Sequence, residues 1–175
     1  STLLLMNNSR VLLFRFLFFV SFILSTSTAH ASHMAGSEIT YTCLGPNQYQ
    51  VKLVIYRDCN GISADASTVI NYRSASCGVN ASIQLNLQST TDITPVCNSA
   101  TTTCAGGTVN GVERLIYTGV LNLPNGCSDW ILSYDMCCRN GSISNLSTPQ
   151  SEDIYVQTTL NNTLTTCNSS PQFTS

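Results

Sequence analysis

The sequence predicts an all-β domain: an immunoglobulin-like antiparallel β-sandwich of about seven strands, cross-linked by disulfide bonds. Apolar and polar residues alternate with a period of two in segments that turn-forming residues separate at intervals of about ten. No long stretch carries the 3.6-residue period of an amphipathic helix. All nine cysteines follow a segment with the features of an export signal, and cysteines at this density in an exported chain typically form disulfides.

Residues 1–31 have the features of a removable signal peptide. Arg10 and Arg15 precede or interrupt the apolar run VLLFRFLFFVSFIL, and the small residues Ala29 and Ala31 complete an A-x-A cleavage pattern. A membrane anchor is the alternative, but a spanning helix needs about 20 apolar residues, and this run of 14 contains an arginine. We expect cleavage after Ala31, with cleavage after Ala29 as the second choice.

The expected mature domain, residues 32–175, has 144 residues, the size of a single domain with its own core. Five basic and nine acidic residues give it a net charge of −4. It has no basic patch, so nucleic acid is not an expected partner. With a single lysine and many serine, threonine and asparagine residues, its composition is typical of secreted β proteins.

The first two expected strands, residues 37–44 and 49–57, flank the turn sequence GPNQ and form a hairpin. Apolar side chains share one face of the second strand: Tyr49, Val51, Leu53 and Ile55. If GPNQ is the turn, opposed residue numbers add to about 93, and Cys43 lies opposite Gln50. Cys59 is then about nine residues, or roughly 30 Å, farther along the second strand. A bond between Cys43 and Cys59 is therefore excluded.

The third, fourth and fifth strands are expected at residues 67–73, 81–88 and 112–123. In the fourth, one face is apolar and carries Ile83, Leu85 and Leu87. The fifth is longer, and we expect it to bend at Gly119.

The last two strands are expected at residues 129–138 and 153–160. Their apolar faces carry Trp130, Leu132, Tyr134, Met136 and Cys138 in the sixth, and Ile154, Val156 and Leu160 in the seventh. Strand alternation places Cys137 and Cys138 on opposite faces. Neighbouring Cα atoms are about 3.8 Å apart, whereas disulfides usually span about 4.4 to 6.8 Å. We expect no bond between these two cysteines, with Cys138 bonded inward and Cys137 bonded to a flanking segment on the outer side.

The cysteines are candidates for structural disulfides. They are Cys43, Cys59, Cys77, Cys97, Cys104, Cys127, Cys137, Cys138 and Cys167. Their odd number predicts four bridges and one unpaired residue. The threonine-rich segment TPVCNSATTTCAGG is expected to form a loop closed by a bond between Cys97 and Cys104. All other pairings remain open.

Catalytic and metal-binding chemistry has few candidate residues. His33 is the only histidine of the expected mature chain, so Ser/His/Asp or Cys/His catalysis would depend on it alone. Cleavage after His30 would instead let Ala31, Ser32 and His33 chelate copper(II). The C-x₂-C spacing of zinc sites does not occur. We expect no enzymatic activity, no cofactor and no metal.

Carbohydrate chemistry supplies the alternative functions. Six tyrosines and a tryptophan could form a platform for glycans: Tyr41, Tyr56, Tyr72, Tyr117, Tyr134, Tyr155 and Trp130. A carbohydrate-binding module is the first alternative, and a hydrolase domain is the second. The adjacent acids Glu152 and Asp153 would alternate faces in a strand and cannot form a glycosidase pair. The sequons NAS, NGS, NLS, NNT and NSS would carry glycans only in a eukaryotic secretory pathway.

Several segments resemble a known family. They are SHMAGSEITYTCLGPNQYQVKLVIYRDCNG, VERLIYTGVLNLP, CSDWILSYDMCCRNGSISNL and TTLNNTLTTCNSSPQFTS. They are similar to the N-terminal region of large gliding-motility-associated surface proteins of Bacteroidota, which are exported through the type IX secretion system. The resemblance covers essentially the whole mature chain, and IYRDC and CCRNG are its most specific parts.

The resemblance implies a structural or adhesive module of a secreted or cell-surface protein, associated with gliding motility. Proteins of that family continue into repeated cadherin-like or immunoglobulin-like domains and a C-terminal sorting domain, so this domain would be the first module of a longer protein. The implied partners are neighbouring domains of the same protein and surface polysaccharide, without membrane contact after signal cleavage. No catalytic residue carries over from the family.

Overall fold

The computed structural model describes residues 33–171, apart from positions 98, 142 and 166. The described residues all belong to one compact unit of the chain, which begins at Ala31. The expected signal peptide lies outside the described residues. Within the described range, no helix has the length and apolar character needed to span a bilayer.

The domain is all-β, as the sequence predicts. Its seven strands are β1 Met34–Gly45, β2 Gln48–Asp58, β3 Ser67–Ser74, β4 Val79–Asp92, β5 Val112–Asn122, β6 Trp130–Cys137 and β7 Asp153–Leu160. Two short 3₁₀ helices, Thr103–Ala105 and Pro149–Ser151, interrupt the connections. Each expected strand is present, because period-two alternation is a direct signature of a sheet with one buried face. β1 begins three residues earlier than expected and β4 ends four residues later.

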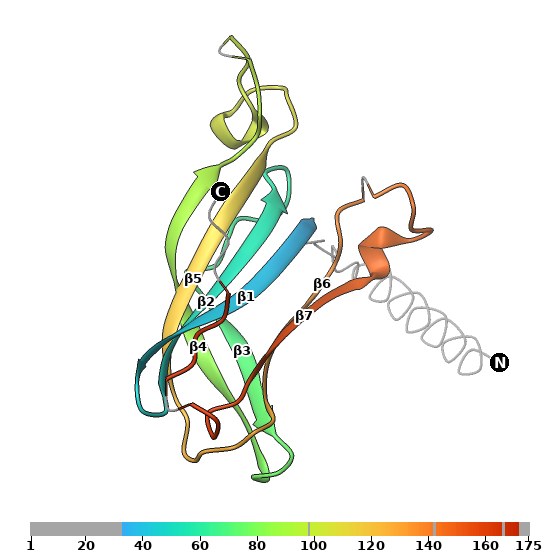
Figure 1. Cartoon of the computed structure of the whole chain (residues 1–175). Coiled ribbons are helices and arrows are strands. Elements are labelled where there is room, and N and C mark those ends of the chain that lie inside the picture. The colour runs from blue at the N-terminus through green and yellow to red at the C-terminus, as the bar shows by residue number, and fades with distance from the viewer. Residues whose placement is uncertain (1–32, 98, 142, 166, 172–175) are drawn as a thin grey trace, which may run out of the picture. The chain divides into compact units, whose positions relative to one another are not determined.

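The strands form an antiparallel sheet in the order β1-β2-β5-β4-β3-β6-β7 (Figure 1). β4 belongs to both layers: residues 79–86 pair with β3, whereas residues 86–92 pair with β5. One layer therefore contains β1, β2, β5 and the second half of β4, and the other contains β3, β6 and β7. If the strands β1 to β7 are lettered A to G, one layer is ABED and the other is CFG. This is the arrangement of the immunoglobulin fold.

Gly119 allows the close approach of β4 and β5 at the point where β4 passes between the layers. A Cβ atom at this position would lie 2.7 Å from Leu85 Cδ2 and 2.8 Å from the Gln84 carbonyl oxygen. The pairing of β4 with β5 begins at the preceding residue, Thr118, which lies opposite Asn86. β5 continues unbroken through this glycine, so its main role is to give space to the neighbouring strand.

β1 and β7 are the two edges of the sheet, and they bring it close to closure. The hydroxyl of Tyr41 donates to the Thr159 carbonyl oxygen at 3.0 Å. At the other end of β1, Met34 forms an isolated parallel bridge with Arg139. The edges of the two layers therefore meet on one side, while β4 joins the layers on the other (Figure 1).

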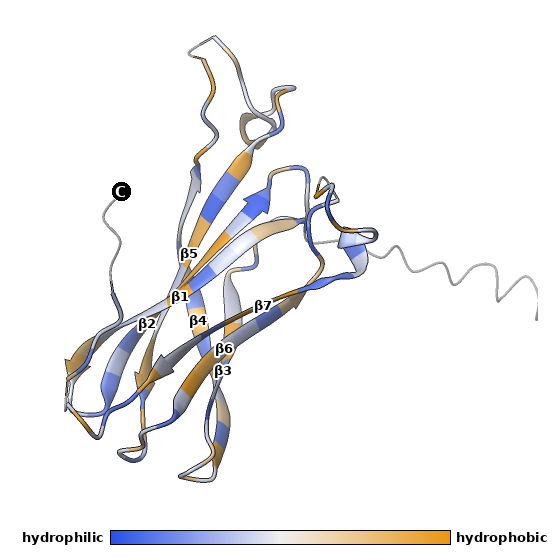
Figure 2. Ribbon diagram, turned by 45° about the vertical axis from the view of Figure 1, so that its right-hand side comes forward, coloured by the Kyte–Doolittle hydropathy of each residue, from blue (hydrophilic) through white to orange (hydrophobic). Residues whose placement is uncertain are grey.

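The core lies between the layers and is built from the inward residues of the alternating strands. The expected face of β2 is confirmed, because Tyr49, Val51 and Leu53 are fully buried. Trp130 and Leu132 of β6 are also fully buried, as their alternation predicts. Hydrophobic (orange) and hydrophilic (blue) residues alternate along several strands in Figure 2, as expected for strands with one buried face.

The first hairpin departs from the expected register by one residue. Its turn consists of Pro46 and Asn47, with Asn47 in the left-handed region at φ 57°. Gly45 pairs with Gln48, but a register shift follows, and Cys43 lies opposite Tyr49 rather than the expected Gln50. The extra residue in β1 is accommodated by this irregularity, which the turn sequence alone does not reveal.

Asn162 joins the β1–β2 turn to the β5–β6 connection and the start of β6, at the end of the sandwich that holds this hairpin turn. Its side chain is buried, and its Oδ1 atom accepts from the Cys127 amide at 2.8 Å and from the indole nitrogen of Trp130 at 3.2 Å. Its Nδ2 atom donates to Asn47 Oδ1 at 2.8 Å and to the Asn125 carbonyl oxygen at 3.1 Å. All four hydrogen-bonding positions of the amide are therefore used.

Candidate functional site

All nine cysteines lie among the described residues, and they form four bridges. The pairs are Cys43 with Cys167, Cys59 with Cys104, Cys77 with Cys127, and Cys137 with Cys138. Cys97 is free and exposed. The expected count of four bridges and one unpaired cysteine is confirmed, as is the exclusion of a bond between Cys43 and Cys59.

The expected bond between Cys97 and Cys104 is wrong. Cys104 bonds to Cys59 at the end of β2, with a Cα separation of 5.0 Å. The long β4–β5 connection folds back toward β2, where the Cys59 amide donates to the Gly111 carbonyl oxygen at 3.0 Å. A Cβ atom on Gly111 would lie 2.5 Å from the sulfur of Cys104, so glycine provides the space for this bridge. Closeness in sequence therefore did not decide the pairing.

The expectation for Cys137 and Cys138 is also wrong, because the two residues bond to each other. It assumed continued strand alternation and a trans peptide. β6 ends at Cys137, the following peptide bond is cis, and the two Cα atoms lie 3.1 Å apart. Cys138 thus does not bond inward to a distant strand, and Cys137 does not bond to a flanking segment.

Residues 138–140, which we call the closure segment, lie between the ends of β1 and β7. The Met34 amide donates to the Cys138 carbonyl oxygen at 3.3 Å, and the Asn140 amide donates to the Met34 carbonyl oxygen at 2.9 Å. On the other side, the Arg139 amide donates to the Glu152 carbonyl oxygen at 3.0 Å. The closure segment therefore joins the two edges of the sheet at this end.

The segments IYRDC and CCRNG meet at the closure segment. The Asp58 side chain is buried, and its carboxylate accepts from the Asn60 amide at 2.9 Å and from Asn140 Nδ2 at 3.3 Å. The Asp58 amide donates to the His33 carbonyl oxygen at 3.1 Å. Two segments separated by about eighty residues thus form one hydrogen-bonded corner of the domain.

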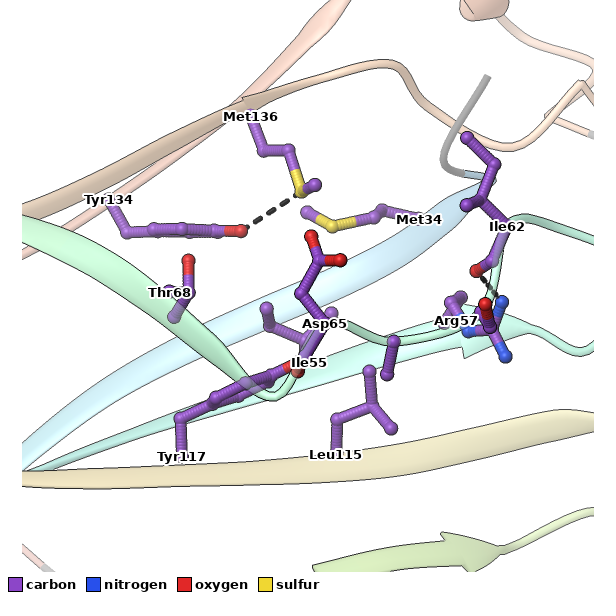
Figure 3. Close-up of a pocket in the computed structure, with 12 residues that line it drawn as sticks. Met34, Ile55, Arg57, Ile62, Asp65, Thr68, Leu115, Tyr117, Tyr134 and Met136 are labelled. Atoms are coloured by element: carbon purple, nitrogen blue, oxygen red, sulfur yellow. Dashed lines mark hydrogen bonds between the residues drawn. The ribbon is translucent and has the colours of Figure 1, made fainter. Parts of the chain in front are cut away.

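A pocket of about 120 Å³ lies beside this corner, between the two layers (Figure 3). Its apolar lining comes from both layers and includes Met34, Ile55, Leu115 and Met136. Residues 62–65 of the β2–β3 connection form its rim. No motif signalled this pocket in the sequence, because its lining residues come from five strands and one loop.

A buried ion pair holds the rim in place. Arg57 Nε donates to Glu113 Oε1 at 2.6 Å, and its Nη2 atom also donates to Glu113. Arg57 Nη1 donates to the Ile62 carbonyl oxygen, which ties the β2–β3 connection to β2. The two side chains are each 11 % exposed, so the pair is largely removed from water. Removal of one partner of such a pair typically leaves a costly uncompensated charge.

Two tyrosines contribute hydroxyl groups to the pocket. The Tyr117 hydroxyl donates to the Asp65 carbonyl oxygen at 2.9 Å, and burial together with nearby Tyr134 and Asp65 raises the pKa of Tyr117 to about 12. The Tyr134 hydroxyl lies 2.9 Å from the sulfur of Met136, and burial also raises the pKa of Tyr134. Both hydroxyls therefore stay neutral near pH 7. The Met136 thioether is only a weak acceptor for the Tyr134 hydroxyl.

The aromatic residues do not gather on one exposed face. Trp130, Tyr41, Tyr117 and Tyr134 are buried, each at most 5 % exposed. Tyr155 on β7 is 55 % exposed. This burial does not favour an aromatic platform for glycans, although six tyrosines and one tryptophan were candidates.

The acidic residues are dispersed. Glu113 pairs with Arg57, and Asp129 accepts hydrogen bonds from the side chain of Ser74 at 2.5 Å and from the Ser76 amide at 2.9 Å. The side chains of Ser74 and Ser76 lower the pKa of Asp129 to about 2. Within the described residues, no group of three or more His, Cys, Asp or Glu side chains could hold a metal ion. The copper chelate would involve residues outside the described range.

Comparison with family models, curated proteins and solved structures found no match. The fold assignment therefore depends on strand topology, and the site assignment depends on geometry.

Proposed function

We propose that this domain is a structural module of a secreted or cell-surface protein, in which tension passes around the sandwich through the Cys43–Cys167 bond. This bond is the observation that carries the proposal. It joins β1 to the C-terminal segment across a sequence separation of 124, with a Cα distance of 5.4 Å. The other three bridges all lie within the loop that the Cys43–Cys167 bond closes.

Hydrogen bonds hold the C-terminal segment along β1 beside this bridge. The Ser170 amide donates to the Tyr41 carbonyl oxygen at 3.0 Å, and the Tyr41 amide donates to Ser170 Oγ at 2.8 Å. The Cys43 amide donates to Ser169 Oγ at 3.0 Å. The two segments that would carry a pulling force are therefore in direct contact near the covalent link.

The bond limits how far a pulling force can extend the domain. Force applied before Cys43 and after Cys167 is borne by the disulfide, and residues 44–166 lie outside its path. Between residues 32 and 175, only about 19 residues can then extend, which corresponds to roughly 65 Å at about 3.5 Å per residue. Without the bond, the Cys59–Cys104 and Cys77–Cys127 bonds still shorten the covalent path, and about 93 residues could extend to roughly 330 Å.

The setting of the module also belongs to the proposal. Disulfides are typical of exported proteins, and four of them are consistent with an extracellular domain. The sequence resemblance supports a location on the surface of gliding bacteria, with export led by residues 1–31 and with neighbouring domains of the same protein and surface polysaccharide as partners. An adhesive role rests on the same resemblance.

Single-molecule force spectroscopy of residues 32–175, with a handle at each end and no reductant, tests the proposal. We expect the oxidised domain to show no unfolding step longer than about 65 Å, and the Cys43→Ser/Cys167→Ser variant to lengthen by roughly 200 to 300 Å in total, the limit set by its remaining disulfides. The Cys77→Ser/Cys127→Ser variant is the matched control and should extend like the wild type, because the Cys43–Cys167 bond encloses its loop. Long extension of the oxidised wild type would refute the proposal.

A further inference from the structure

The pocket beside the closure segment is large enough for a small molecule. Protein interiors contain few voids larger than a water molecule. This pocket has a volume of about 120 Å³. An apolar cavity of about 150 Å³ binds benzene, so the present one, at about 120 Å³, has room for about five non-hydrogen atoms.

The lining suits an alkyl group attached to a cationic nitrogen. The side chains of Met34 and Met136 are flexible and polarisable, and can adapt to a branched hydrocarbon. The rings of Tyr117 and Tyr134 extend into the pocket from opposite layers (Figure 3). Aromatic rings attract organic cations through the negative faces of their π systems.

The charges at the pocket favour a cation over an anion. The guanidinium group of Arg57 is already neutralised by Glu113 and also donates to the Ile62 carbonyl oxygen. The carboxylate of Asp65 extends toward the two methionines and the Tyr134 hydroxyl (Figure 3). Among the described residues that line the pocket, Asp65 alone has a charge with no opposite charge within salt-bridge distance.

Access to the pocket is through the rim that carries this charge. Ile62, Ser63 and Asp65 are exposed, whereas Ile55 and Leu115 at the base are buried. A ligand entering past the rim would therefore place its apolar part against the base and keep its charged part near Asp65.

We propose that this pocket binds a small organic cation, an alkylammonium whose nitrogen meets the Asp65 carboxylate and whose carbon atoms lie between Tyr117 and Tyr134. This binding function goes beyond the structural role proposed above and does not depend on it. Both hydroxyls and the buried ion pair keep their observed partners when the ligand binds.

The first test compares tert-butylammonium with tert-butanol, which has the same hydrocarbon group without the charge. Each is titrated into isotopically labelled residues 32–175 with the disulfides intact, and amide chemical shifts are followed by NMR. We expect tert-butylammonium to bind more tightly, with shifts concentrated at residues 62–65 and at Tyr134 and Met136. Shifts that lie elsewhere, equal affinities for the two compounds, or no shifts at tens of millimolar ligand would overturn the proposal.

Asp65→Asn tests the role of the charge. We expect it to weaken tert-butylammonium binding about two- to fivefold, the effect of one solvent-exposed ion pair, and to leave tert-butanol binding unchanged. Glu152→Gln is the matched control, because Glu152 is an exposed carboxylate outside the lining, and it should change neither affinity. An Asp65→Asn variant that binds both compounds like the wild type would contradict the assignment.

Ala64→Leu tests the role of the space. Ala64 lines the pocket in the same loop, and a larger side chain there should prevent binding of both compounds. Amide spectra of each free variant show whether the fold is kept. If Ala64→Leu does not fold, the comparison of two ligands on the wild type and Asp65→Asn still decides the proposal. Unchanged binding by a folded Ala64→Leu would place the ligand elsewhere and refute it.

Discussion

Replacing Asn162 with alanine should strongly destabilise the domain, since this side chain satisfies buried groups that have no access to water. The substitution removes four hydrogen bonds and leaves the Trp130 indole nitrogen and the Cys127 amide without their acceptor. Each buried donor left unpaired costs about 1 to 3 kcal/mol. From these two unpaired donors alone, we expect the free energy of unfolding to fall by about 2 to 6 kcal/mol.

Urea denaturation with all disulfides intact measures this loss, and Trp130 fluorescence reports the transition. Asn161→Ala is the matched control. Its Oδ1 atom accepts from the Thr163 amide at 3.0 Å and from Thr163 Oγ1 at 2.8 Å in an exposed turn, so we expect a loss of no more than about 1 kcal/mol. If Asn162→Ala costs no more than Asn161→Ala, the reasoning about this buried amide is refuted.

Three further predictions concern the ion pair, an acidic side chain and a glycine. Glu113→Gln should lower the free energy of unfolding by about 3 kcal/mol in urea and speed amide exchange in the β2–β3 connection, because Arg57 loses its counter-charge; an effect below about 1 kcal/mol would contradict this. Because serine side chains hold the pKa of Asp129 at about 2, its stabilising effect is complete above about pH 4 and is lost as the pH falls through about 2. Thermal melts should therefore show the difference between wild type and Asp129→Asn shrinking from pH 5 to pH 2, and a constant difference would disprove this origin. Gly119→Ala should lower the melting temperature by several degrees because its Cβ meets Leu85, whereas Gly45→Ala, which meets nothing within 4 Å, should change it little.

The strands could be predicted because each one carries its own local signal. In a strand with one buried face, apolar and polar residues alternate in the sequence. The buried residues of β2 and β6 follow this alternation closely. The odd number of cysteines, together with their position after a segment with the features of an export signal, also predicted four bridges and one unpaired residue. Strand positions depend on neighbouring residues, and the number of bridges depends on a count of cysteines, so a single sequence is enough to predict both.

The bridge partners and the site could not be predicted in the same way. Cys104 bonds to Cys59 because the long β4–β5 connection folds back on β2, and sequence spacing carries no record of that fold. The vicinal bond escaped prediction because strand alternation ends at Cys137. The pocket combines residues from both layers, and Asn162 lies after β7 in a segment with no periodic pattern, so only the three-dimensional arrangement reveals either of them.

The most direct test of the central claim is disulfide mapping by mass spectrometry of residues 32–175 expressed in the periplasm, alkylated before reduction and digested without reductant. We expect a peptide pair joined through Cys43 and Cys167, with alkylation at Cys97 alone. Alkylated Cys43 and Cys167, or a bond from either of them to another cysteine, would remove the covalent route for tension around the sandwich and contradict the proposed function.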